Sequence, residues 1–158
     1  MFYYLQNVFT EYKQQVENDA SQHSSLEKII LIYRFYIKCV LETGLEFITG
    51  LYAANTNQAF NFLERDPKNE MVLDRVREYL IEGKASGEIR SDVDINMALL
   101  RIGVIITGMI YYWCIFGGRI DLASQTDLML QDYLITLAAN KNASFELEPI
   151  SPLEGSLI

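Results

Sequence analysis

Histidine and cysteine, which most metal and nucleophilic sites require, are scarce in this sequence. The one histidine, His23, lies in a stretch rich in serine and glutamine, which is typical of a solvated loop residue. A lone histidine without a neighbouring cysteine offers no zinc site. Phosphate-binding loops, dinucleotide fingerprints and the serine nucleophile elbow are also absent. We therefore expect no enzyme activity, no metal site and no cofactor.

The two cysteines, Cys39 and Cys114, lie in apolar stretches far apart in the sequence. Free cysteine is among the most buried residue types, so both are interpreted as reduced core residues and not as a disulfide framework. The first residues lack the basic region and the cleavage site of a secretory signal. Both observations favour the cytoplasm.

Positive charge is also in short supply. The formal net charge is -8, and no lysine or arginine stands next to another. A surface this acidic repels phosphate backbones, and it has no basic face from which counterions could be released on binding. Binding of DNA or RNA by this chain alone is therefore not expected.

Proline is rare, and two of the three prolines stand in the last ten residues. Elsewhere, apolar residues recur at three- and four-residue steps, the period of an amphipathic helix. Ser24 with Glu27 has the spacing of a capping box, and Asp92 or Asp94 is suited to cap a later helix. The sequence predicts an all-α bundle of about six helices. Their expected ranges are 1–18, 24–42, 45–63, 66–84, 93–116 and 122–139.

These helices make up one expected domain, 1–140, followed by a polar tail, 141–158, that contains proline and is expected to be disordered. The first apolar stripe starts without a capping residue before it, which predicts that another segment precedes it in the intact protein.

The seventeen residues from Ile102 to Gly118, which make up most of the fifth predicted helix and the two residues after it, carry no charge. A membrane span needs ~20 apolar residues, and this stretch is shorter. Every other predicted helix has a polar face, so we interpret this helix as part of a soluble domain and not as a membrane span. A helix that is apolar all round must be covered all round, and one small domain has few helices to spare for this. We therefore expect a homodimer in which the last two helices of each copy form a four-helix bundle. The interface is predicted to contain Gly103, Gly108, Tyr111, Ile115, Leu130, Leu134 and Leu137.

Aromatic side chains and side chains with polar tips are plentiful on the middle helices, where most of them would pack in an ordinary core. Ligand pockets are apolar with a few converging polar groups, and the run from Asn55 to Asn57 beside Phe60 has that character. An apolar or aromatic small molecule is the expected ligand. The candidate ligand-binding residues are Tyr33, Tyr36, Phe47, Tyr52, Thr56, Phe60, Thr107, Met109, Tyr112 and Trp113.

The residues YLIEGKASGEIRSDVD at 79–94 resemble the C-terminal domain of TetR-family transcriptional regulators. The apolar helix that follows, with Gly103, Gly108 and Trp113, is also similar to that family, and the resemblance extends over about residues 1–139. It implies a homodimer joined through the last two helices, with a small-molecule effector bound between the helices of each copy. DNA contact would come only through an N-terminal helix-turn-helix domain, which is missing from this sequence.

Two other function classes stay open. The first is a helical protein-interaction adaptor without a ligand. The second is a helical-bundle metal carrier or enzyme, for which Glu42 and Glu46, four residues apart, are the candidate pair. Metal sites in such bundles pair glutamate with histidine, which this part of the chain does not offer.

Overall fold

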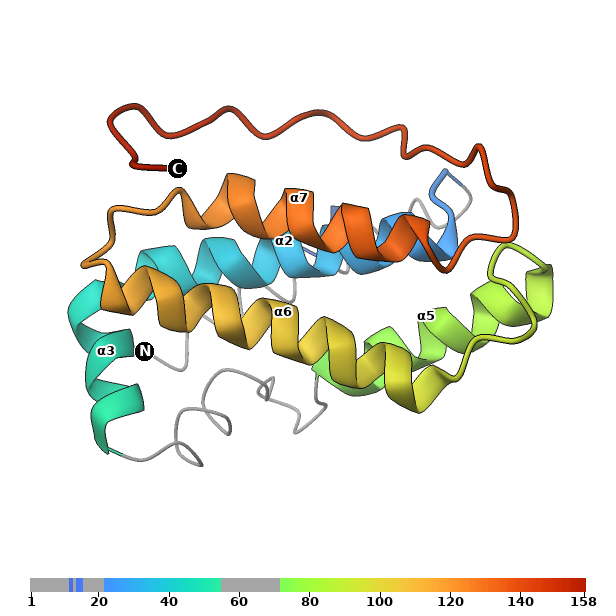
Figure 1. Cartoon of the computed structure of the whole chain (residues 1–158), viewed down its shortest axis with the longest axis horizontal. Coiled ribbons are helices and arrows are strands. Elements are labelled where there is room, and N and C mark those ends of the chain that lie inside the picture. The colour runs from blue at the N-terminus through green and yellow to red at the C-terminus, as the bar shows by residue number, and fades with distance from the viewer. Residues whose placement is uncertain (1–11, 13, 16–21, 55–71) are drawn as a thin grey trace.

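The computed structural model describes residues 12, 14, 15, 22–54 and 72–158, and these residues form five helices without strands (Figure 1). The all-α class is therefore confirmed. Most of the predicted helix at 1–18 and the second half of the one at 45–63 lie outside the described residues. The helices are α2 (Ser25–Thr43), α3 (Leu45–Ala54), α5 (Val72–Ser86), α6 (Ile95–Ile115) and α7 (Leu122–Ile135).

Helix α2 is the central element of the bundle and contacts α5 on one side and α7 on another. It begins at the predicted capping box, in which the Ser24 hydroxyl accepts from the amide of Glu27 and the Glu27 carboxylate accepts from the amide of Ser24. It ends before Gly44, whose φ of 95° suits glycine. Five of its apolar side chains, spaced at helical steps, are buried in the core. They are Leu26, Ile30, Tyr33, Ile37 and Val40.

The loop between α5 and α6 joins the ends of three helices. The Glu88 carboxylate accepts hydrogen bonds from the amides of Ser25 (2.9 Å) and Leu26 (3.0 Å), two of the unpaired amides at the start of α2. Next to it, Ile89 forms an isolated antiparallel bridge with Ala138, just after α7. This pairing explains why α7 ends at Ile135, several residues before the predicted end. The residues around 136–139 are engaged by the loop instead.

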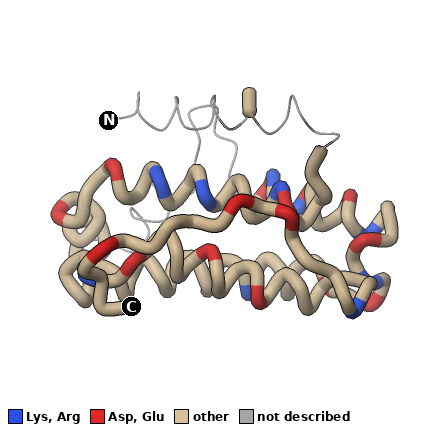
Figure 2. The backbone as a smooth tube through the Cα atoms, turned by 90° about the horizontal axis from the view of Figure 1, so that it is seen from above, with Lys and Arg blue, Asp and Glu red and all other residues tan. Residues whose placement is uncertain are grey.

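The C-terminal tail runs back along α7 and crosses the bundle (Figures 1 and 2). The sequence predicts disorder over 141–158, whereas the structure gives this tail a defined path. The amide of Glu146 donates to the Glu27 carboxylate (3.0 Å), and the amide of Leu153 donates to Asp121 (2.5 Å). The sequence of the tail shows only its polar composition. It does not show that carboxylates of the bundle accept hydrogen bonds from the backbone amides of the tail.

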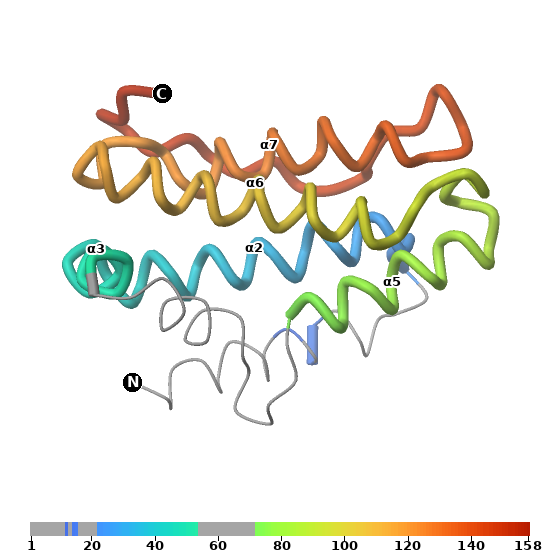
Figure 3. Tube along the Cα trace, turned by 60° about the horizontal axis from the view of Figure 1, so that its bottom comes forward, coloured from blue at the N-terminus to red at the C-terminus, as the bar shows by residue number. Residues whose placement is uncertain are grey.

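Helix α6 runs beside α7 (Figures 1 and 3), and α3 is seen nearly end-on in Figure 3. Helix α6 is the one helix among the described residues that is long and apolar enough to cross a membrane by length and composition, and 33% of that stretch is buried within the protein. Ile102, Ile106 and Ile110 are buried, and α6 contacts α3, α5 and α7. Asp94 is its capping residue.

Candidate ligand groove and exposed apolar face

A groove of about 800 Å³ lies between α5 and α6, next to α3. Its walls are mostly apolar, with Leu73 on α5 facing Leu99 and Gly103 on α6. Helices α5 and α6 are joined by a short loop and contact each other. The groove therefore forms where two rows of side chains, each repeating at helical spacing, face one another.

The groove differs in character at its two ends. At the α3 end, the rings of Tyr52 and Tyr111 lie with centroids 5.8 Å apart and are tilted by 58°. At the other end, Arg77 donates to the side-chain oxygen of Asn96 (2.8 Å), and Asp74 also lines the wall. An elongated molecule could therefore meet aromatic surface at one end and charged groups at the other.

The predicted ligand-binding residues do not come together in one place. Tyr52 and Thr107 line the groove. Tyr33, Tyr36 and Trp113 are buried core residues, and Phe47 and Met109 pack partly buried against that core. These five residues therefore pack in or against the core of the bundle, and none of them lines the groove. Tyr112 is exposed and does not line the groove. Thr56 and Phe60 lie outside the described residues.

Several groove residues were missed as ligand-binding candidates. Gly103, Gly108 and Tyr111 had been predicted for a dimer interface, and they line the groove. Leu73 and Arg77 on α5 were not singled out, although their four-residue spacing places them on one helix face. Only the pairing of α5 with α6 brings these positions together, and that pairing is not encoded in either helix alone.

The second feature is an exposed apolar face on α6 and α7. Val104 is 64% exposed and Ile115 is 58% exposed, although each is a large apolar side chain. Leaving such a side chain in water forfeits roughly 1.5 to 3 kcal/mol relative to burying it. We use the name exposed apolar face for the exposed apolar side chains of these two neighbouring helices. They are Met97, Leu100, Val104, Tyr111, Tyr112 and Ile115 on α6 with Leu128 and Met129 on α7.

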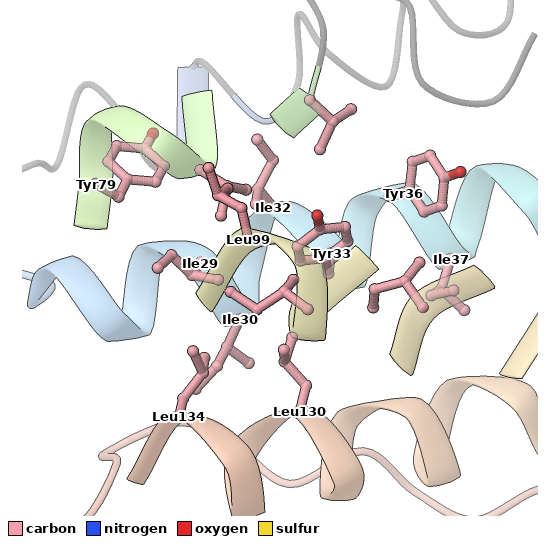
Figure 4. Close-up of a cluster of buried hydrophobic side chains, with 14 of the residues drawn as sticks. Ile29, Ile30, Ile32, Tyr33, Tyr36, Ile37, Tyr79, Leu99, Leu130 and Leu134 are labelled. Atoms are coloured by element: carbon pink, nitrogen blue, oxygen red, sulfur yellow. The ribbon is translucent and has the colours of Figure 1, made fainter. Parts of the chain in front are cut away.

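Three residues predicted for the dimer interface are buried in the protomer, two of them on α7 and one just after it. Leu130, Leu134 and Leu137 are almost fully buried in the protomer's own core, and Figure 4 shows the first two pointing from α7 toward the side chains of α2. Leu128 and Met129 are the exposed apolar residues of this helix. The sequence showed an apolar helix but not which face α2 would cover.

A partly buried ion pair ties α2 to α7. Arg34 donates from Nε to Asp127 Oδ1 (2.7 Å) and from Nη2 to Oδ2 (3.0 Å), a two-pronged geometry that fixes both side chains. Gln131 also donates to Asp127 (2.7 Å), and Arg34 donates to the carbonyl of Glu148 in the tail (2.8 Å). The hydrogen bonds of this group therefore join α2, α7 and the tail.

The described parts of the chain contain two cysteines and no cluster of metal ligands. Both cysteines are free, and burial raises the pKa of Cys39 to about 11 and also raises that of Cys114. A raised pKa keeps a thiol protonated and therefore poorly nucleophilic. Among residues 22–54 and 72–158, no three side chains of His, Cys, Asp or Glu are placed to hold a metal ion.

Comparisons of the chain with protein-family models, with curated proteins and with solved structures find no match. The groove, the exposed apolar face and the family resemblance of residues 79–94 are the features that bear on function.

Proposed function

We propose that this chain is the effector-sensing and dimerisation domain of a TetR-like transcriptional regulator. The observation that carries the proposal is the groove between α5 and α6. Small-molecule sites are typically clefts of about 300 to 1,000 Å³ with apolar walls and a few polar groups. The groove, at about 800 Å³, has that size, and its described walls carry the charged residues Asp74 and Arg77 and the hydroxyl groups of Tyr52, Thr107 and Tyr111. Its ligand is a small apolar or aromatic molecule.

The dimerisation part of the proposal is supported by the exposed apolar face. Side chains such as Val104 and Ile115 gain free energy when a second surface covers them. In a two-fold dimer the same face meets itself, so α6 and α7 of each copy would form a four-helix bundle. DNA contact belongs to a helix-turn-helix domain outside this sequence, in agreement with the net charge of -8.

A dye titration tests the ligand site. N-phenyl-1-naphthylamine, a neutral aromatic dye that fluoresces in apolar sites, should bind saturably and raise the melting temperature, since binding to the native state alone stabilises it. Gly103→Leu should weaken this binding at least ~10-fold by filling the groove, because a Cβ at Gly103 meets no atom within 4 Å. Gly50→Leu on α3 is the matched control and should bind as the wild type does. No saturable binding, or equal binding by Gly103→Leu, contradicts the ligand site.

Sedimentation velocity tests the dimer. The wild type should sediment as a dimer at micromolar concentration, and sedimentation as a monomer there contradicts this part of the proposal. An adaptor without a ligand is the second candidate, since the exposed apolar face is also the kind of surface that a partner helix covers. It predicts a monomer that binds no dye in the groove.

A further inference from the structure

We infer that the ligand groove and the dimer interface are one continuous site, in which α6 of the second copy forms the outer wall of the groove. This inference rests on the proposed function. It adds that the site is incomplete in one protomer, and that ligand binding and dimerisation therefore strengthen each other.

The first observation is that the two features share residues. Leu100, Val104 and Tyr111 line the groove, and they are also 58%, 64% and 50% exposed. Residues that line a closed pocket would be largely buried. The groove is therefore open to solvent along the same edge of α6 that carries the exposed apolar face.

The second observation concerns charge, which limits the places where a second copy of the chain can approach. The chain has a net charge of -8, and acidic residues are spread over the helices and the tail in Figure 2. Two such molecules repel each other over most of their surfaces. The stretch from Ile102 to Gly118 carries no charge, so this part of α6 can approach its own copy without like-charge contacts.

The third observation is the pair of glycines on this edge. Gly103 and Gly108 line the groove, and a Cβ built at either position meets no atom within 4 Å. Glycine inside a helix costs about 0.5 to 1 kcal/mol relative to alanine, so the fold of the single protomer gains nothing from them. A helix of a second copy that approaches closely, or a ligand held beneath it, would use the space that they leave.

Linkage makes this arrangement measurable. If the second copy supplies a wall, the dye must bind the dimer more tightly than the monomer, and it must favour dimerisation by the same factor. The test needs a variant that breaks the dimer without altering the groove. Ile115 lies on the exposed apolar face but does not line the groove, and at 58% exposure a glutamate there stays in water in the monomer.

The experiment compares Ile115→Glu with the wild type by sedimentation velocity and by titration with N-phenyl-1-naphthylamine. We expect a folded monomer that binds the dye ~10-fold or more weakly than the wild-type dimer. Leu41→Glu is the matched control, since Leu41 is 40% exposed on α2, a helix that contributes no described residue to the groove. It should remain dimeric and keep the wild-type affinity. Leu128→Glu on α7 repeats the test if Ile115→Glu fails to give a native circular dichroism spectrum.

The possible failures are distinguishable. A monomeric Ile115→Glu with wild-type dye affinity shows that one protomer completes the groove, which overturns this inference but leaves the proposed function intact. A wild type that binds the dye as a monomer overturns both the inference and the dimer. A wild-type dimer that binds no dye removes the ligand site and the inference with it. Solubility only in detergent would assign the exposed apolar face to lipid and overturn the inference.

Discussion

Gly83 in α5 is the position where one added methyl group should do the most damage. A Cβ built there lies 2.7 Å from Cδ1 and 3.0 Å from Cγ1 of Ile89, and 3.2 Å from Cβ of Ser25. Ile89 is 1% exposed and therefore has little room to turn away. Gly83 thus allows the loop after α5 and the start of α2 to pack against α5.

The expected effect of Gly83→Ala is the difference between two terms. Alanine favours the helix by about 0.5 to 1 kcal/mol over glycine. Forcing a methyl group into a filled site typically costs about 1 to 3 kcal/mol. The free energy of unfolding should therefore fall by up to about 2.5 kcal/mol. Gly50→Ala is the matched control, since Gly50 is exposed within α3 and a Cβ there meets nothing within 4 Å. It should stabilise the protein by about 0.5 to 1 kcal/mol.

Urea denaturation followed by circular dichroism, at one fixed protein concentration, measures both variants, because the stability of a dimer depends on concentration. Ile89→Val deletes Cδ1, the atom nearest to the new methyl group. In the Ile89→Val background, Gly83→Ala should therefore destabilise the protein by at least about 0.5 kcal/mol less than it does in the wild type. A Gly83→Ala protein stabilised as much as Gly50→Ala would refute the reasoning. So would a penalty that Ile89→Val leaves unchanged.

Three further substitutions test the contacts that join the elements. Asp127→Ala strips the Arg34 guanidinium of its carboxylate partner and should cost ~2 to 4 kcal/mol in urea denaturation, with Asp127→Asn losing less. A loss below ~0.5 kcal/mol would show that solvent screens the pair. Asp121→Ala removes the cap of α7 and the acceptor for the Leu153 amide, so hydrogen exchange in 153–158 should accelerate while that of α2 does not, and unchanged exchange in the tail contradicts this. Burial raises the pKa of Cys39 from 9.0 to about 11, so the folded protein keeps a proton that the unfolded chain releases. The free energy of unfolding therefore has its full value below pH 9. It falls as the pH rises from 9 through about 11, by at most ~3 kcal/mol in total. Cys39→Ala should remove this part of the pH dependence, and parallel stability curves for the two proteins between pH 9 and 11 would exclude it.

The helix ends that are set by local chemistry were predictable. The reciprocal hydrogen bonds of Ser24 and Glu27 depend on three residues of spacing, and the stop at Gly44 depends on one backbone conformation. The start of α6 at Asp94 was one of two options in the sequence. The end of α7 was not predictable, because it is determined by pairing with the distant loop at Glu88–Ile89.

The candidate site was predictable only in its ingredients. Tyr52 and Thr107 belong to the expected set and line the groove, whereas Tyr33 and Trp113 fill the core. All four have the composition of a pocket residue, and only the packing of neighbouring helices separates a lining side chain from a core side chain.

The sequence by itself determined that this protein is helical and acidic, because apolar periodicity and charge are local properties of the chain. It also placed an excess of apolar surface on α6. The tertiary structure decided which face of α7 is buried, that Glu88 caps α2, and that α5 and α6 leave a groove between them. Each of these depends on which helices become neighbours. That choice is made by the whole buried surface at once and by no single segment.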